Sequence, residues 1–200
     1  FTDEMPSPYA TFVSNAGLYR IVADLGGAGD LNGDGHADLV FSAGDSNVGA
    51  RSAGRVEVVW GPIVTGLQEL AMADRLTIRG DQDSQHVDCP AVLPDATGDG
   101  RDELAIGANF TYDTGLTGLT YVWAGEDLSG TLIAGQDMVV VADEGLGSRQ
   151  LHGYCANAWR GAGSVGDANG DGLGDLLIRG AVAEEDDPEQ LDTLFLFLGV

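Results

Sequence analysis

The 200-residue sequence is poor in basic residues, with 9 lysines and arginines against 32 aspartates and glutamates and a formal net charge of -23. Binding the phosphates of DNA or RNA requires a basic surface, so a nucleic-acid partner is disfavoured, and an anionic membrane is disfavoured for the same reason. So many carboxylates repel one another in a compact fold, and bound cations would relieve that repulsion. The composition therefore indicates bound metal ions. The alternative is a salt-adapted, highly solvated surface.

Cysteine is nearly absent as well, and the two that occur, Cys89 and Cys155, are not part of a Cys-x-x-Cys pair. A zinc or thioredoxin-type site therefore lacks support. The two residues could form one disulfide in an oxidising compartment, or they could be two buried thiols. No apolar run approaches the ~20 residues of a membrane span, so membrane insertion is not expected. No signal peptide is visible, and the acidic, proline-containing start is what a processed or excised piece would have.

Motifs of known catalytic sites are missing too. The sequence has no Gly-x-Ser-x-Gly elbow, no His-Glu-x-x-His and no phosphate-binding glycine loop. Carboxylate pairs suited to glycoside hydrolysis could be drawn anywhere in so acidic a chain, so their presence indicates nothing. We therefore predict that the chain is not an enzyme.

Glycine, by contrast, is abundant: there are 31, clustered in short turns between apolar runs, and 44% of the residues are hydrophobic. This is typical of many short strands punctuated by turns, and it is enough apolar material for a packed core.

Three acidic segments align on one pattern and start 65 and 72 residues apart (95 minus 30, and 167 minus 95). Each has oxygen-bearing side chains at positions 1, 3 and 5, glycine at positions 4 and 6, and a carboxylate at position 9. The residues at positions 1, 3, 5, 7 and 9 are Asp30, Asn32, Asp34, His36 and Asp38; Asp95, Thr97, Asp99, Arg101 and Glu103; and Asp167, Asn169, Asp171, Leu173 and Asp175.

This spacing predicts a metal-binding loop. Oxygen ligands at positions 1, 3 and 5 curl around one cation, glycine at position 6 permits the turn, and position 7 offers its backbone carbonyl, so its side chain can vary. Mostly anionic oxygen ligands suit a hard cation such as calcium, and magnesium less well because it prefers to keep several waters. The EF-hand is excluded because position 12 is apolar in all three copies. We expect about three calcium sites, the second weaker because Thr97 stands at position 3.

The similarity between copies continues past each loop into runs that alternate with a period of two, which indicates strands. We expect an N-terminal strand segment at residues 1–15, then repeats at 16–80, 81–150 and 151–200, each a four-stranded antiparallel blade within a single structural unit. A short helix is expected around 66–74. Trp60, Trp123 and Phe197 are expected at one equivalent position, packed between blades.

At these loops and strands the sequence resembles the FG-GAP repeat family, the calcium-binding blades of integrin α-type propellers and many bacterial surface proteins. The resemblance covers about residues 16–199, although the family's Phe-Gly start is absent before all three loops. It implies an all-β propeller, structural calcium, and an extracellular role in adhesion or ligand presentation. Partners would be other protein chains or surface glycans.

Three blades are too few to close a ring, since propellers have ~4 to 8, and an open stack leaves two sheet edges. The chain is then a fragment of a longer propeller, part of a multi-chain ring, or a polymer subunit that self-associates through its edges. The strand at 9–13 could pair with 194–198, either to close the ring of its own chain or to meet a neighbouring chain. Asn109 begins an N-glycosylation sequon in what is expected to be an exposed loop.

The functional prediction is an extracellular, calcium-stabilised adhesion or structural module. The alternatives are a subunit of an extracellular filament and a non-catalytic scaffold within a larger secreted hydrolase or lyase.

Overall fold

The structure is a computed structural model, and it describes residues 7–13, 24–43, 46–70, 73–110, 117–130, 132–134, 139–141, 162–184 and 187–200. Blade 1 is an antiparallel sheet of β2 (Leu25–Gly29), β3 (Asp38–Ser42), β4 (Arg55–Val59) and β6 (Arg75–Arg79). Blade 2 is formed by β7 (Asp88–Leu93), β8 (Glu103–Phe110), β9 (Thr117–Trp123) and β11 (Val139–Val141). Blade 3 contains β12 (Ala162–Gly166), β13 (Asp175–Glu184) and β14 (Asp187–Phe197).

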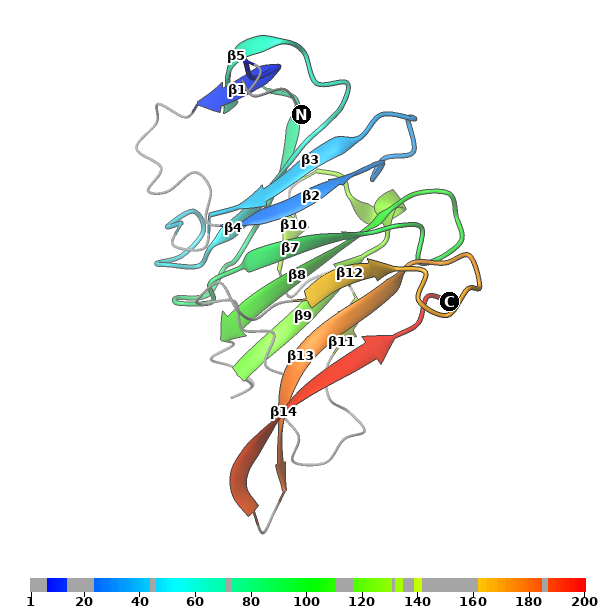
Figure 1. The fold of residues 1–200 in the computed structure, drawn as a ribbon. Helices are drawn as coiled ribbons and strands as arrows, with labels where there is room; N and C mark the ends of the chain where they lie inside the picture. Colours follow the sequence, from blue (N-terminus) through cyan, green and yellow to red (C-terminus); the bar gives the residue numbers. More distant parts are fainter. Residues whose placement is uncertain are drawn as a thin grey trace.

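The blades follow one another in chain order as a stack (Figure 1). Hydrophobic side chains that alternate along the strands supply a core on each side of blade 2. The larger core, between blades 1 and 2, includes Val56, Val58, Ile106, Tyr121 and Trp123. A smaller core, between blades 2 and 3, includes Leu93, Ala105, Leu176 and Ile178, with Val122 and Phe197 packed against it. The chain is thus an all-β protein of propeller-type blades, as predicted.

Strand register corrects one detail of the predicted repeat. Leu39, Leu104 and Leu176 stand at the same place after the three loops, and they pair with Val59, Trp123 and Phe197. Trp60 is therefore displaced by one residue from Trp123, and the prediction that the two are equivalent is wrong. Because side chains alternate between faces, one residue moves Trp60 to the opposite face of its blade. It still packs in a core, since it lies against the cluster between blades 1 and 2.

Two further predictions fail near the N-terminus. The strand β1 (Ala10–Val13) pairs in parallel with β5 (Gly66–Glu69) and not with residues 194–198. Those four residues, Gly66–Glu69, are therefore a strand where a helix was expected; edge pairing with β1 prevails over local propensity. The strand β10 (Leu132–Ile133) pairs in parallel with β6. A segment within residues 81–150 therefore extends the sheet of blade 1.

The described residues also include one short 3-10 helix, η2 (Gly125–Asp127). Within the parts of the chain that the structure describes, no helix has the length and apolar character needed to cross a membrane.

Candidate metal centre

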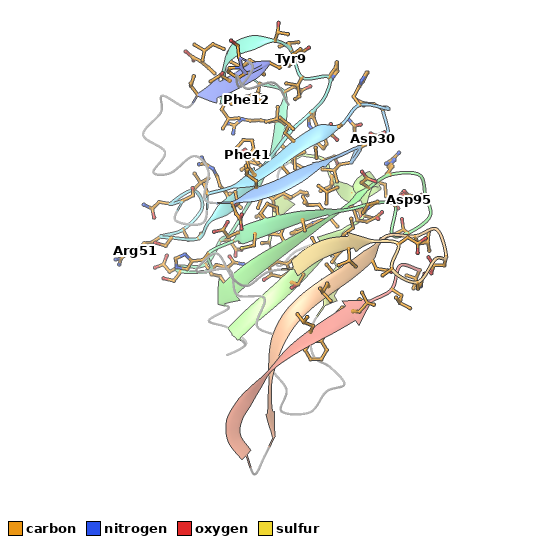
Figure 2. The ribbon with its side chains drawn as sticks, in the orientation of Figure 1. Tyr9, Phe12, Asp30, Phe41, Arg51 and Asp95 are labelled. Atoms are coloured by element: carbon orange, nitrogen blue, oxygen red, sulfur yellow. The ribbon has the colours of Figure 1, made fainter. Side chains whose placement is uncertain are left out.

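The three acidic segments form turns at one end of the blades. Loop 1 (residues 30–38) joins β2 to β3, loop 2 (95–103) follows β7, and loop 3 (167–175) follows β12. Figure 2 shows Asp30 and Asp95 at the same end of the stack. Positions 4 and 6 have positive φ in every loop, for example 75° and 84° at Gly33 and Gly35. Only glycine adopts this conformation without strain, which is why both positions are glycine in all three copies.

Loops 1 and 3 share one hydrogen-bond pattern. In loop 1 the carboxylate of Asp30 accepts bonds from the amides of Asp34 (3.0 Å) and Gly35 (2.8 Å), and Asn32 Oδ1 accepts from the Asp34 amide (2.9 Å). The equivalent distances in loop 3 are 3.1, 2.8 and 2.9 Å. The side chains at positions 1 and 3 thus curl the loop so that their oxygens share its interior.

The carboxylate at position 9 is buried in each loop: Asp38 is 0% exposed, Glu103 1% and Asp175 0%. Asp38 accepts bonds from the amides of Leu31 (2.9 Å) and Gly61 (2.8 Å), which tie the loop to the end of β4. Asp175 binds the equivalent amides of Ala168 (2.8 Å) and Gly199 (3.0 Å). Position 9 therefore joins each of these loops to the glycine after the third strand of its blade.

Burial raises the pKa of Asp38 above its ordinary value, and the neighbouring charges of Asp34 and Asp30 add to the rise, while its two backbone hydrogen bonds oppose it. The pKa of Glu103 is raised for the same reasons, with Asp99 and Asp95 as the neighbouring charges. At neutral pH each of these two loops therefore holds a buried carboxylate whose charge is disfavoured.

Loop 2 differs in the way its third position is used. The Thr97 hydroxyl donates to Glu103 Oε1 at 2.9 Å, and the Ala96 amide donates to Oε2. In loop 2 the side chains at positions 3 and 9 are therefore hydrogen-bonded to each other, because glutamate is long enough to reach the threonine hydroxyl. An asparagine oxygen at position 3 would remain directed into the loop, as it is in loops 1 and 3.

One basic side chain lies on the loops, since Arg101 of loop 2 packs against Gly33 of loop 1. Glu57 forms ion pairs with Arg55 and Arg75, and neither pair involves a loop carboxylate. Uncompensated carboxylates in a shared turn favour a cation.

The acidic side chains of each loop supply only part of the ligand set that a cation needs. Among the described residues, no three side chains of histidine, cysteine, aspartate or glutamate converge as a metal ligand set. A cation would need the asparagine at position 3 and the backbone carbonyl at position 7 in addition to the carboxylates, and it would use their remaining lone pairs, since each carboxylate oxygen has two. Oxygen donors of this kind suit calcium and not a thiolate- or imidazole-binding metal.

The side chains at position 7 form contacts between consecutive loops. A Cβ on Gly33 would lie 3.1 Å from Arg101 Cγ, and one on Gly98 would lie 3.4 Å from Leu173 Cδ2. Position 4 of each loop therefore lies against position 7 of the next, and this relation repeats across the stack. His36 begins the series and is exposed.

Asp102 is a residue of the loop region that the repeat analysis missed. Its carboxylate accepts the amides of Asp30 (2.8 Å) and Asp95 (3.1 Å), and its own amide donates to the Asp30 carbonyl (3.0 Å). It thereby bridges position 1 of loops 1 and 2. The sequence signal was its departure from the pattern, because loops 1 and 3 have Ala37 and Gly174 at this position.

Two other predicted sites lie outside the loops. Cys89 is disulfide-bonded, and the other cysteine of the sequence, Cys155, lies outside the described residues. Asn109 is the penultimate residue of β8 and not part of a loop, so the loop expected there is wrong.

Fold and site together define a protein of propeller-type blades with an acidic loop in each. Residues 24–59 match the family model of the FG-GAP repeat, so the chain contains an FG-GAP repeat, and the match spans β2, loop 1, β3 and β4. Two curated relatives are similar over nearly the whole chain. Phosphatidylinositol-glycan-specific phospholipase D of Rattus norvegicus is 31% identical over 181 residues, 86% of this chain, and that of Mus musculus is 30% identical over 88% of it. The chain spans 20% of the length of each relative.

Proposed function

We propose that this chain is an extracellular, calcium-binding FG-GAP module that acts in adhesion or structural assembly and is not itself catalytic. One to three calcium ions would bind in loops 1 to 3, neutralise their carboxylates and stabilise the stack. The residues offered at each site are positions 1, 3, 5 and 9 through their side chains and position 7 through its carbonyl.

The observation that supports this proposal most is the buried carboxylate at position 9. Asp38, Glu103 and Asp175 are each at most 1% exposed and are anchored by loop amides beside further aspartates, and none has a basic partner among the described residues. Burying an unpaired charge costs several kcal/mol unless it is compensated. A cation bound in each loop would compensate this charge.

A second candidate function is a non-catalytic scaffold within a larger secreted hydrolase. The similarity to the two phosphatidylinositol-glycan-specific phospholipases D favours it, and the chain would then correspond to one fifth of such a protein. Within this candidate the blades would position or stabilise a catalytic region elsewhere. The purified chain alone should therefore not hydrolyse phosphatidylinositol-glycan substrates, and hydrolysis by it would overturn the non-catalytic assignment.

The test of the metal sites is thermal unfolding of the chain with calcium, with magnesium and with excess chelator, together with calorimetric titration of calcium. A site saturated at 100 times its Kd adds about 2.7 kcal/mol to the free energy of unfolding. For a domain of this size that is a rise in Tm of about 5–10 °C per site. We expect calcium to raise Tm by at least this amount and magnesium to fail to replace it.

The matched variants remove one carboxylate each. Asp34→Asn and Asp171→Asn should each remove one calcium from the titration, whereas Glu126→Gln, an exposed residue of η2, should leave the count unchanged. An unchanged Tm on chelation with no bound calcium would show that the loops are turns held only by their own hydrogen bonds.

A further inference from the structure

Asp102 stands at position 8 of loop 2, and its carboxylate is shared between two loops. Its Oδ2 accepts the amide of Asp30 at 2.8 Å, and its Oδ1 accepts the amide of Asp95 at 3.1 Å. The amide of Asp102 also donates to the carbonyl of Asp30 at 3.0 Å. Both polar backbone groups of Asp30 are therefore held by a residue 72 positions later in the chain.

Asp30 is the residue around which loop 1 is organised. Its carboxylate accepts the amides of Asp34 and Gly35, at 3.0 and 2.8 Å, and these bonds close the turn. Because Asp102 holds the backbone of Asp30 on both sides, the place of the Asp30 carboxylate within loop 1 depends on the conformation of loop 2.

The packing around Asp102 is close as well. A Cβ on Gly29 would overlap Asp102 Oδ2, and a Cβ on Gly125 would lie 2.9 Å from the Asp102 carbonyl oxygen and 2.8 Å from Arg101 Cβ. The side chain of Arg101 lies against Gly33 of loop 1. Protein interiors packed this closely transmit displacements, so a shift of residues 101–102 would move loop 1 with them.

The other two loops differ at position 8. Loop 1 has Ala37 there and loop 3 has Gly174, and neither side chain can accept a hydrogen bond. Loop 3 meets loop 2 through packing contacts, in which Gly174 lies against the backbone of Pro94 and Leu173 lies close to Gly98. A polar bridge at position 8 is therefore present between loops 1 and 2, and the residue at position 8 of loop 3 has no side chain to form one.

The position of Asp102 within loop 2 links this bridge to cation binding, a step that rests on the proposed function. In that function the carbonyl of Arg101 and the carboxylate of Glu103 are ligands, and Asp102 lies between them in the chain. A cation in loop 2 would fix the residues on both sides of Asp102, and through its carboxylate it would also fix Asp30. Loop 1 then loses less conformational freedom when it binds its own cation. By linkage, a cation in loop 1 favours binding in loop 2 by the same factor.

Electrostatics oppose this coupling only in part. Loops 1 and 3 each carry three carboxylates, and loop 2 carries four carboxylates and one arginine, so each loop has a net charge of -3. A loop that holds a divalent cation keeps a charge of -1, so it still attracts a cation in the next loop, although less than an empty loop does. The Debye length of about 8 Å at physiological ionic strength weakens this difference further.

We propose that Asp102 is a positioning residue that couples the cation sites of loops 1 and 2, so that a cation bound in one loop raises the affinity of the other. Loop 3 binds independently of this pair. The coupling follows from the side chain at position 8 and not from the ligand pattern that the three loops share.

Calorimetric titration of calcium measures the coupling in three variants. Asp171→Asn leaves loops 1 and 2 as the binding pair, and addition of Asp99→Asn or Asp34→Asn leaves loop 1 alone or loop 2 alone. The coupling factor is the overall two-site association constant of the pair divided by the product of the two single-loop constants. We expect a factor of about five or more, which is the lower end of the usual range for coupled sites.

Loops 2 and 3 supply the matched control pair. Asp34→Asn leaves these two loops, and addition of Asp99→Asn or Asp171→Asn leaves loop 3 alone or loop 2 alone. The same ratio should be less than about two for this pair, because no side chain at position 8 joins the two loops. It also measures how far neighbouring cations weaken one another without a bridge.

Asp102→Ala, added to each variant of the first pair, tests the bridge itself. Loop 1 has alanine at this position, so loop 2 can form its turn with it. The lost charge weakens the single-loop and the two-site constants alike and cancels in the ratio, so the coupling factor should fall to about one. Asp102→Asn, which has the size of aspartate without the charge, replaces Asp102→Ala if the alanine variant does not fold.

The outcomes separate this proposal from the proposed function. Calcium binding with a factor of one or less in the first pair would refute the coupling and leave the calcium function standing. Absence of calcium heat from every variant would refute both. A factor of five that persists in both Asp102 variants would refute the role of Asp102, because another contact between the loops would then carry the coupling.

Amide hydrogen exchange provides a second readout. In the chain with Asp34→Asn and Asp171→Asn, calcium binds to loop 2 alone, and it should slow exchange in the peptide covering residues 29–36 by about fivefold or more. Asp102→Ala should abolish this slowing. Exchange in loop 1 that is unchanged by calcium in loop 2 would overturn the proposal.

Discussion

Replacing Asp38 by alanine separates the structural role of position 9 from its role as a metal ligand. The Asp38 carboxylate is completely buried and accepts the amides of Leu31 and Gly61 at 2.9 and 2.8 Å. Asp38→Ala removes both acceptors at once. It also removes a charge whose burial is unfavourable in the absence of a cation, as the raised pKa indicates.

The magnitude follows from these two opposed effects. A buried amide left without a partner costs about 1–3 kcal/mol, and the amide of Leu31 cannot reach water because that residue is 0% exposed. Gly61 is half-buried and can be partly hydrated. Relief of the buried charge offsets part of the loss, so in chelator the free energy of unfolding should fall by about 1–3 kcal/mol. In calcium at 100 times its Kd a further loss of about 2.7 kcal/mol is expected, because loop 1 then loses a ligand.

The assay is urea unfolding at pH 7, once in chelator and once in calcium, with Glu126→Ala as the exposed carboxylate control. The m-value should stay constant, since the unfolded surface does not change. An equal loss in both conditions would refute a ligand role for Asp38. A loss below about 0.5 kcal/mol in chelator would refute the hydrogen-bond reasoning.

Three other substitutions address the second loop, the blade contact and the outer face. Thr97→Asn combined with Glu103→Asp gives loop 2 the pattern of the other loops and should raise its calcium affinity, measured by calorimetric titration; an unchanged affinity would contradict the importance of position 3. Gly174→Ala places a methyl group against the backbone of Pro94. The free energy of unfolding measured in urea should fall by about 1–3 kcal/mol. An unchanged free energy of unfolding would mean that blades 2 and 3 can separate slightly at no cost. Glu57→Gln leaves the buried guanidinium of Arg55 and the partly exposed one of Arg75 without a counter-charge and should cost about 3–5 kcal/mol; a stabilising result would show that the ion network is dispensable.

Much of the fold could be predicted because it is repeated locally. Loop 1 forms from its own Asp30, Asn32 and glycines, so its spacing alone identified it. The alternating strands that follow each loop were identified for the same reason, since their apolar period of two is a property of consecutive residues. The division of residues 1–200 into repeats and the calcium sites themselves stay predictions.

The failures share one cause, which is pairing between segments distant in the sequence. β1 pairs with β5, more than fifty residues later in the chain, and β10 adds to the sheet of blade 1; neither pairing has a local signal. The equivalence of Trp60 and Trp123 failed because a shift of one residue, invisible in composition, decides which face of a strand a side chain occupies.

The sequence by itself determined the turn chemistry of the three loops, the all-β architecture and the acidic charge, because each depends on residues close together in the chain or on composition alone. The tertiary structure decided which carboxylates are buried and that Asp102 bridges loops 1 and 2. These properties arise from the packing of one blade on the next, and that packing depends on strand register and on contacts between residues far apart in the chain.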